Sequence, residues 1–252
     1  MIIKRFDRQE ELDRYAAHLI NTIVREKQHP VLGLATGSTP VGIYKAVIEE
    51  ASRTKLSFGH VTTYNLDEYV GLAPDHEQSY SRYMNDHLFK HLDLGKGNTH
   101  LPDGLAADPE AECRRYDEML AQQPLDVQLL GVGHNGHIGF NEPDAQLHGR
   151  THVVKLKEET RKANARFFDQ AEQVPEFAFT MGVGSILKAK MIILVARGGD
   201  KAAIVKKALQ GPITTECPAS LLQTHANVIV LLDADAGRDL IEDGTRFQLV
   251  HS

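Results

Sequence analysis

The sequence of 252 residues has only two cysteines, no tryptophan and no excess of basic residues. Cys113 and Cys217 form neither a CxxC pair nor a metal-type cluster, so a disulfide-rich scaffold is excluded and a reducing compartment is expected. The formal net charge of -6 excludes the broad basic surface that binds nucleic acid or an anionic membrane. We therefore expect a cytoplasmic protein that acts on a small molecule.

Long apolar runs are also missing. No stretch approaches the roughly 18 to 20 apolar residues that span a bilayer, and residues 1–10 lack the apolar core of a signal peptide, so we expect neither membrane insertion nor export. The composition, with 42% hydrophobic and 25% charged residues, is that of an ordinary globular protein. No repeat or long linker divides the chain, so we expect a single domain over residues 1–252.

Short apolar runs alternate with amphipathic segments along the chain. The runs are continuous, as is typical of strands buried on both faces, and they cover residues 31–35, 61–66, 126–132, 191–196 and 227–233. Helical periodicity is found in residues 10–25, 40–53, 79–91, 109–122, 160–169 and 200–210. This order predicts a Rossmann-like, doubly wound α/β fold, with a mostly parallel sheet and helices on both faces.

The loop after the first run is a candidate phosphate site, because such folds bind ligands at the carboxyl ends of their strands. It contains Gly37, Ser38, Thr39 and Pro40 and leads into a helical segment. Small residues let backbone N–H groups approach an anion, and proline suits the first helical position. The same residues would also serve as an ordinary helix cap.

Two further loops carry acid–base residues. Asp67 follows the second run, where a partly buried carboxylate would serve as a general base; a turn cap is the alternative. His137 and Glu142 share the loop after the third run, where a carboxylate bonded to one ring nitrogen would leave the other to transfer a proton. A zinc site made with His134 is a weaker alternative, because the loop has no cysteine and no helical pair of ligands.

Residues 131–136 also match the dinucleotide pattern G-x-G-x-x-G. That pattern requires a helix to open at the glycines, but glycine and proline interrupt the residues that follow. A nicotinamide dehydrogenase is therefore the less favoured interpretation.

Three segments together closely resemble the glucosamine-6-phosphate deaminase family, which is related to 6-phosphogluconolactonase. They are residues 33–40 (GLATGSTP), 65–72 (NLDEYVGL) and 131–143 (GVGHNGHIGFNEP), and the similarity continues through residues 161–168, 174–175, 180–184 and Lys201. The resemblance covers nearly the whole chain and implies an enzyme of amino sugar and N-acetylglucosamine catabolism that uses neither metal nor organic cofactor. The implied reaction converts D-glucosamine 6-phosphate and water into D-fructose 6-phosphate and ammonia.

The resemblance also implies a role for each matching residue. His137 would open the pyranose ring, oriented by Asn135 and Glu142, and Asp67 would then move a proton from C2 to C1. The substrate phosphate would be held by Gly37, Ser38, Thr39, Arg166 and Lys201. Residues from about 157 to 177 resemble the mobile lid of the family.

Two positions depart from the pattern of some relatives. Many carry Asp where this chain has Asn135, so we expect a pH optimum that differs from theirs. In hexameric relatives, two basic residues at the positions of His152 and Val154 bind N-acetylglucosamine 6-phosphate; Val154 cannot make that contact, so we expect hyperbolic kinetics without this activation. Both a monomer and a homo-oligomer are compatible with the sequence. A 6-phosphogluconolactonase and a non-catalytic sugar-phosphate sensor are the remaining alternatives.

Overall fold

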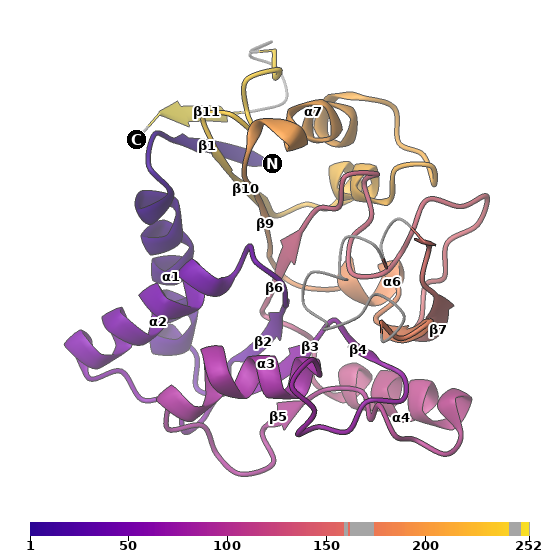
Figure 1. The fold of residues 1–252 in the computed structure, drawn as a ribbon. Helices are drawn as coiled ribbons and strands as arrows, with labels where there is room; N and C mark the ends of the chain where they lie inside the picture. The colour runs from indigo at the N-terminus through magenta and orange to yellow at the C-terminus, as the bar shows by residue number, and fades with distance from the viewer. Residues whose placement is uncertain (159–160, 162–173, 242–247, 252) are drawn as a thin grey trace.

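The computed structural model describes residues 1–158, 161, 174–241 and 248–251 (Figure 1). Its main sheet has eight strands: β1 (Ile2–Phe6), β2 (Val31–Leu34), β3 (Thr62–Asn65), β5 (Thr99–His100), β6 (Val127–Gly131), β9 (Ile192–Ala196), β10 (Val228–Asp233) and β11 (Gln248–His251). Their order is β11-β1-β10-β9-β6-β2-β3-β5, and every pair of neighbours is parallel. The expected mostly parallel sheet is confirmed.

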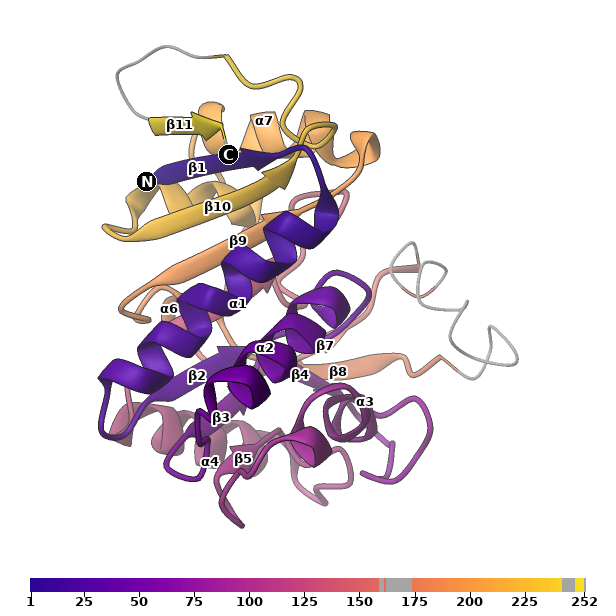
Figure 2. The same cartoon turned by 90° about the vertical axis from the view of Figure 1, so that its left-hand side faces the viewer.

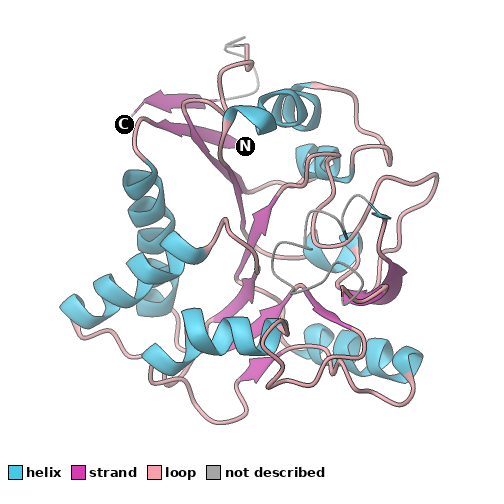
Figure 3. Cartoon of the chain, in the orientation of Figure 1, coloured by secondary structure: helices cyan, strands magenta, loops and turns pink. Residues whose placement is uncertain are grey.

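Helices cover both faces of this sheet (Figures 1 and 3). One face carries α1 (Gln9–Glu26) and α2 (Val41–Thr54), with α3 (Tyr80–His87) beside them, and the other carries α4 (Pro109–Gln122), α6 (Val183–Ile186) and α7 (Ala202–Gln210). On α1, Leu12, Ala16, Ile20 and Val24 are buried at four-residue spacing, so one stripe of the helix faces the sheet.

A second, antiparallel sheet was not expected from the sequence. It contains β4 (Asp67–Tyr69), β8 (Phe177–Thr180) and β7 (His152–Lys155), in the order β4-β8-β7. Only Leu66 separates β4 from β3, and Asp67 pairs with Thr180 across the new sheet. Asp67 is therefore held by strand pairing and does not cap a turn.

The predicted helix boundaries need three corrections. Pro40, expected at the first helical position, is the N-cap residue of α2, and the helix begins one position later at Val41. The helix expected at residues 79–91 ends at His87, because Leu88 leaves helical geometry and a 3₁₀ turn follows. Likewise α7 begins at Ala202, after a 3₁₀ turn at residues 199–201.

Some predictions concern residues that the structure does not describe. Apart from residue 161, the helix expected at residues 160–169 lies outside the described residues, as does most of the predicted lid. Within the described residues, no helix is long and apolar enough to cross a membrane. A single domain over the whole chain stays a prediction.

Candidate active site

The segments that follow β2, β3, β6 and β9 carry those predicted site residues that the structure describes. Lys201, after β9, donates a hydrogen bond from Nζ to the Val132 carbonyl at 3.0 Å, just beyond β6. A Cβ built on neighbouring Gly131 would lie 3.9 Å from Thr39 Oγ1, which belongs to the loop after β2. The fold therefore brings Lys201 and Thr39 to the same segment of the chain, although 161 positions separate them in the sequence.

Hydrogen bonds from tyrosine side chains fix the backbone of the loop between β2 and α2. Gly37 has φ +95°, a conformation that favours glycine, and its carbonyl accepts a hydrogen bond from the Tyr83 hydroxyl at 2.6 Å. At the other end of the loop, Tyr44 Oη donates to the Ala35 carbonyl at 2.5 Å and accepts the Ala35 N–H at 3.2 Å. Ser38 is exposed beside a hollow of about 360 Å³ that this loop shares with α3. The loop is therefore accessible to a ligand.

Lys201 is the described cation of the predicted phosphate site. Burial lowers the pKa of its amine, and the negative charge of Asp200 opposes that effect. Because desolvation disfavours the charged form, an anion beside Nζ would be a favourable partner. Arg166, the second predicted cation, lies outside the described residues.

His137, Asn135 and Glu142 form a hydrogen-bonded chain. Asn135 Nδ2 donates to Glu142 Oε2 at 2.6 Å, and Asn135 Oδ1 lies 2.8 Å from His137 Nδ1. An ionised carboxylate only accepts hydrogen bonds, so it fixes the amide orientation, and Nδ1 must carry the proton donated to Oδ1. Direct contact between the imidazole and the carboxylate is longer, at 3.5 Å between Nδ1 and Oε2.

This geometry leaves Nε2 of the imidazole as a proton acceptor. The His137 side chain is 24% exposed, whereas that of Glu142 is 5% exposed. The ring packs directly on Gly133, where a Cβ would lie 2.2 Å from His137 Cε1, so no other residue fits at that position without movement. The sequence predicted contact between His137 and Glu142, and the structure places Asn135 between them.

Asp67 has the strongly perturbed carboxyl group of the site. It is 6% exposed, and burial, assisted by the negative charge of Glu68, raises its pKa from 3.8 to about 8. Within the described part of the chain, no lysine or arginine pairs with it. A carboxyl group with a pKa near the working pH suits general acid–base catalysis.

Asp67 and the histidine loop lie next to each other. A Cβ built on Gly139, two positions after His137, would lie 3.7 Å from Asp67 Oδ2 and 3.0 Å from Thr180 Oγ1. The Phe140 N–H donates to the same Thr180 hydroxyl at 3.0 Å, which ties this loop to the strand opposite β4. The loop that carries the predicted proton shuttle therefore lies against the strand that carries the predicted base.

The alternatives to this arrangement are not supported by the described residues. His134 pairs with Asp200 at 2.6 Å, away from His137, and no group of three or more described His, Cys, Asp or Glu side chains is arranged to hold a metal ion. No helix opens within residues 131–143, so the dinucleotide pattern has no helix N-terminus to complete it.

Glu68 is a buried carboxylate of the candidate site for which the sequence predicts no role. Glu68 is 2% exposed and accepts hydrogen bonds from three backbone N–H groups. The signal in the sequence was a second acidic residue directly after Asp67, but a pair of adjacent carboxylates is usually solvated. Only the second sheet shows that both are enclosed.

Comparisons with known proteins agree with this geometry. Residues 6–231 match the family described as glucosamine-6-phosphate isomerases/6-phosphogluconolactonase. The chain is 49% identical over 235 residues to a glucosamine-6-phosphate deaminase of Thermoanaerobacter pseudethanolicus, covering 93% of this chain and 92% of that protein. It is 52% identical over 230 residues to the deaminase of Bacillus velezensis, covering 90% and 95%.

Solved structures show the same relationship. A monomeric glucosamine-6-phosphate deaminase superimposes with a TM-score of 0.93 and 46% identity, covering 95% of this chain and all of that one. A 6-phosphogluconolactonase from Thermotoga maritima, at 17% identity and a TM-score of 0.74, shares the fold. The chain therefore belongs to the glucosamine-6-phosphate isomerase/6-phosphogluconolactonase family, and within it to the glucosamine-6-phosphate deaminases.

Proposed function

We propose that this chain is an enzyme that converts D-glucosamine 6-phosphate and water into D-fructose 6-phosphate and ammonia. The observation that carries the proposal is a buried carboxyl group of raised pKa, Asp67, beside the hydrogen-bonded chain of His137, Asn135 and Glu142. Relatives about half identical over some nine-tenths of the chain are glucosamine-6-phosphate deaminases.

Ring opening is the task for His137. With its Nδ1 proton directed to Asn135, Nε2 is free to take the proton of the C1 hydroxyl and return it to the ring oxygen as the C1–O5 bond breaks. The imidazolium formed between these steps is stabilised by the Glu142 carboxylate, 3.5 Å from Nδ1. Asn135 and Glu142 are therefore positioning residues, and His137 is the group that moves the proton.

Asp67 is the base for the open-chain sugar. Its carboxylate removes the C2 proton while the C1 carbonyl oxygen takes up a proton, which gives an enolamine. Return of the proton to C1 gives an imine at C2; water adds there, and ammonia leaves as the ketone forms. The C2 ammonium of the bound substrate would favour ionised Asp67, which burial alone disfavours.

The substrate phosphate would lie against the loop of Gly37, Ser38 and Thr39, near the amine of Lys201. The hydrogen bond from Lys201 to Val132 and the closeness of Thr39 to Gly131, the last residue of β6, support this placement. Arg166 remains a proposed second cation.

We also infer that N-acetylglucosamine 6-phosphate does not activate this enzyme. His152 has a pKa lowered by burial, and Val154 packs against the cluster of Tyr69, Phe140 and Leu156, so neither residue of β7 offers a positive charge near neutral pH. A monomer is the state we propose, as for the structural neighbour described as monomeric. A cytoplasmic location and a role in amino sugar catabolism stay predictions.

A coupled assay tests the activity directly. Purified protein is incubated with glucosamine 6-phosphate, and ammonium and fructose 6-phosphate are measured in parallel; the proposal requires both in equal amounts. His137→Gln should abolish both products, while His134→Gln, on the same loop but paired with Asp200, should remain active. If the protein hydrolysed 6-phosphogluconolactone and released no ammonia from glucosamine 6-phosphate, the result would contradict the proposal.

A further inference from the structure

Glu68 is a buried carboxylate that the mechanism above does not use. Its Oε1 accepts hydrogen bonds from the N–H groups of Tyr69 and Tyr80, each at 2.9 Å, and its Oε2 accepts one from Ser81 at 2.8 Å. Three charge-assisted bonds to backbone donors from two elements fix the carboxylate and, equally, the donors. A side chain that only filled space would not need this geometry.

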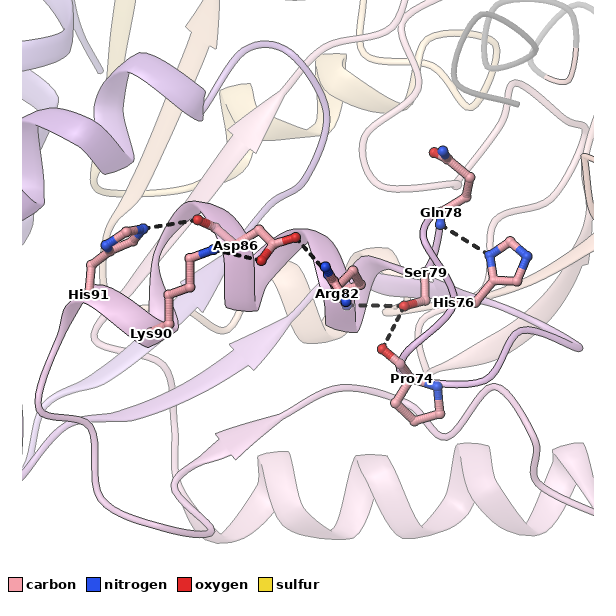
Figure 4. Close-up of polar contacts among 8 residues, drawn as sticks. All are labelled: Pro74, His76, Gln78, Ser79, Arg82, Asp86, Lys90 and His91. Carbon is pink, nitrogen blue, oxygen red and sulfur yellow. Dashed lines mark hydrogen bonds and ion pairs between the residues drawn. The ribbon is translucent and has the colours of Figure 1, made fainter. Parts of the chain in front are cut away.

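Two of these donors open α3. Tyr80 and Ser81 are its first residues, whose N–H groups have no partner inside the helix. Ser79 caps the helix in the usual way, accepting the Arg82 N–H at 3.0 Å while its hydroxyl donates to the Pro74 carbonyl (Figure 4). Glu68 adds a carboxylate at the positive end of the helix and joins that end to β4. Figures 1 and 2 both show α3 beside β4.

Tyr80 is the residue that this connection orients. Its ring lies 4.8 Å from that of Tyr69 on β4 and stacks on Phe140 of the histidine loop, with centroids 6.2 Å apart at 14°. Its hydroxyl donates to that of Tyr69 at 3.3 Å and also interacts with the side chain of Thr36, which begins the phosphate loop. The first turn of α3 thus contacts the phosphate loop, the strand of Asp67 and the histidine loop together.

We propose that Glu68 is a positioning residue for the deamination: its carboxylate fixes the first turn of α3, and through Tyr80 it sets the histidine loop and the phosphate loop against Asp67. The inference rests on the proposed function. Glu68 touches no reacting atom in this scheme.

The charge of Glu68 also acts on Asp67. Burial is the main cause that raises the pKa of Asp67, and Glu68 is the second. Among the described residues, the other titratable groups that interact with Asp67 are the hydroxyls of Tyr44 on α2, Tyr80 on α3 and Tyr116 on α4, all of which have raised pKa values and are neutral at the working pH. Removing the negative charge of Glu68 should therefore lower the pKa of Asp67.

Two substitutions of Glu68 change its charge and its side-chain length separately. Glu68→Gln keeps the length, removes the charge and replaces one acceptor oxygen by an amide donor. The acid limb of the pH profile of kcat/KM should therefore move down by about one pH unit, and kcat should fall as well. Glu68→Asp keeps the charge but is one methylene shorter, so the limb should stay while kcat falls about 10- to 100-fold through displacement of Tyr80. If both variants kept the acid limb of the pH profile and the kcat of the unmodified protein, the proposal would be overturned.

A matched control shows whether loss of any buried glutamate has this effect. Glu112 is 6% exposed, accepts the Asp103 N–H at 2.8 Å and pairs with Arg115, and it is not among the groups that shift Asp67. Glu112→Gln should lower the melting temperature without moving the acid limb. If Glu68→Gln behaves in the same way, Glu68 is only structural.

Variants of Tyr80 keep the test decisive if Glu68→Gln does not fold. Tyr80→Phe preserves the ring and should retain more activity than Tyr80→Ala, which should lose kcat by about tenfold or more. Equal activity of the two would overturn the role given to Tyr80. If the unmodified protein releases no ammonia from glucosamine 6-phosphate, it is the proposed function that fails.

Discussion

Replacing Asp67 by Asn should abolish turnover and, at alkaline pH, stabilise the fold. The carboxyl group has a pKa of about 8 in the folded protein and 3.8 ordinarily, because burial and Glu68 disfavour its charge. Below pH 4 it is protonated in both states and has no effect. As the pH rises from about 4 to 8, the unfolded chain loses the proton and the folded protein does not, so stability falls continuously across this interval.

The size of the effect follows from the difference between the two pKa values. Each pH unit between 3.8 and about 8 corresponds to about 1.4 kcal/mol, so ionised Asp67 costs on the order of 5 kcal/mol of folding free energy at pH 9. For a protein of this length, that corresponds to a change in Tm of roughly 10 °C or more. Asn has nearly the same shape and does not ionise, so Asp67→Asn should lack this pH dependence.

The assay is thermal unfolding of both proteins from pH 5 to pH 9. The quantity compared is the change in Tm with pH, so any constant effect of the amide cancels. Asp126→Asn is the matched control. Burial raises the pKa of the Asp126 carboxyl, but bonds from Lys190, Val31 and Lys27 outweigh it and the net pKa is lowered, so Asp126 stabilises the fold above its ordinary pKa. That variant should lose stability at neutral pH.

Parallel Tm curves for the unmodified protein and Asp67→Asn would refute the reasoning. They would mean that Asp67 is ionised at the same pH in the folded and unfolded states. The activity gives an independent check, because removal of a general base should lower kcat by about 10²- to 10⁴-fold.

Three further outcomes are expected. Asn135→Ala should lower kcat about 10²-fold with little change in KM, because His137 loses the acceptor that fixes its tautomer; steady-state kinetics at the optimum pH check this. Lys201→Met should raise KM for glucosamine 6-phosphate about tenfold or more and weaken inhibition by inorganic phosphate, since a charged partner of the phosphate is lost. The dependence of the initial rate on glucosamine 6-phosphate concentration should be hyperbolic with and without N-acetylglucosamine 6-phosphate. A sigmoidal dependence that becomes hyperbolic when that compound is added would contradict the role inferred for His152 and Val154.

Much of the main sheet could be predicted because each of several strands corresponds to a short apolar run in the sequence. The runs that became β2, β6, β9 and β10 are mostly apolar, with Gln128 inside β6 and Asp233 at the end of β10, and all six residues of β10 are buried. The strands β4, β7 and β8 could not be found in this way. They have three or four residues each, β4 contains two carboxylates, and all three depend on pairing between distant segments, such as Asp67 with Thr180.

The candidate site residues could be named from the sequence, but the geometry of those that the structure describes could not. Position after an apolar run identified Asp67 and His137, because the carboxyl ends of parallel strands meet at one edge. No pattern in the sequence shows that Asn135 stands between His137 and Glu142, since this depends on side-chain rotamers in a loop. The burial of Glu68 depends on α3 lying against β4, a contact between elements that sequence periodicity does not encode.

Asp67 and Asp126 are buried at opposite ends of the parallel strands, and their different partners explain why the pKa of one is raised and that of the other lowered. At the amino ends, backbone N–H groups are free to donate, and Val31 donates to Asp126 at 2.9 Å. At the carboxyl ends, backbone carbonyls are free to accept: the Asn65 carbonyl accepts from the Tyr116 hydroxyl at 2.7 Å, and that of Val132 accepts from Lys201 at 3.0 Å. Asp67 lies just beyond the carboxyl end of β3, where burial and the negative charge of Glu68 together raise its pKa to about 8. A substrate ammonium beside Asp67 would oppose both effects and favour the ionised form.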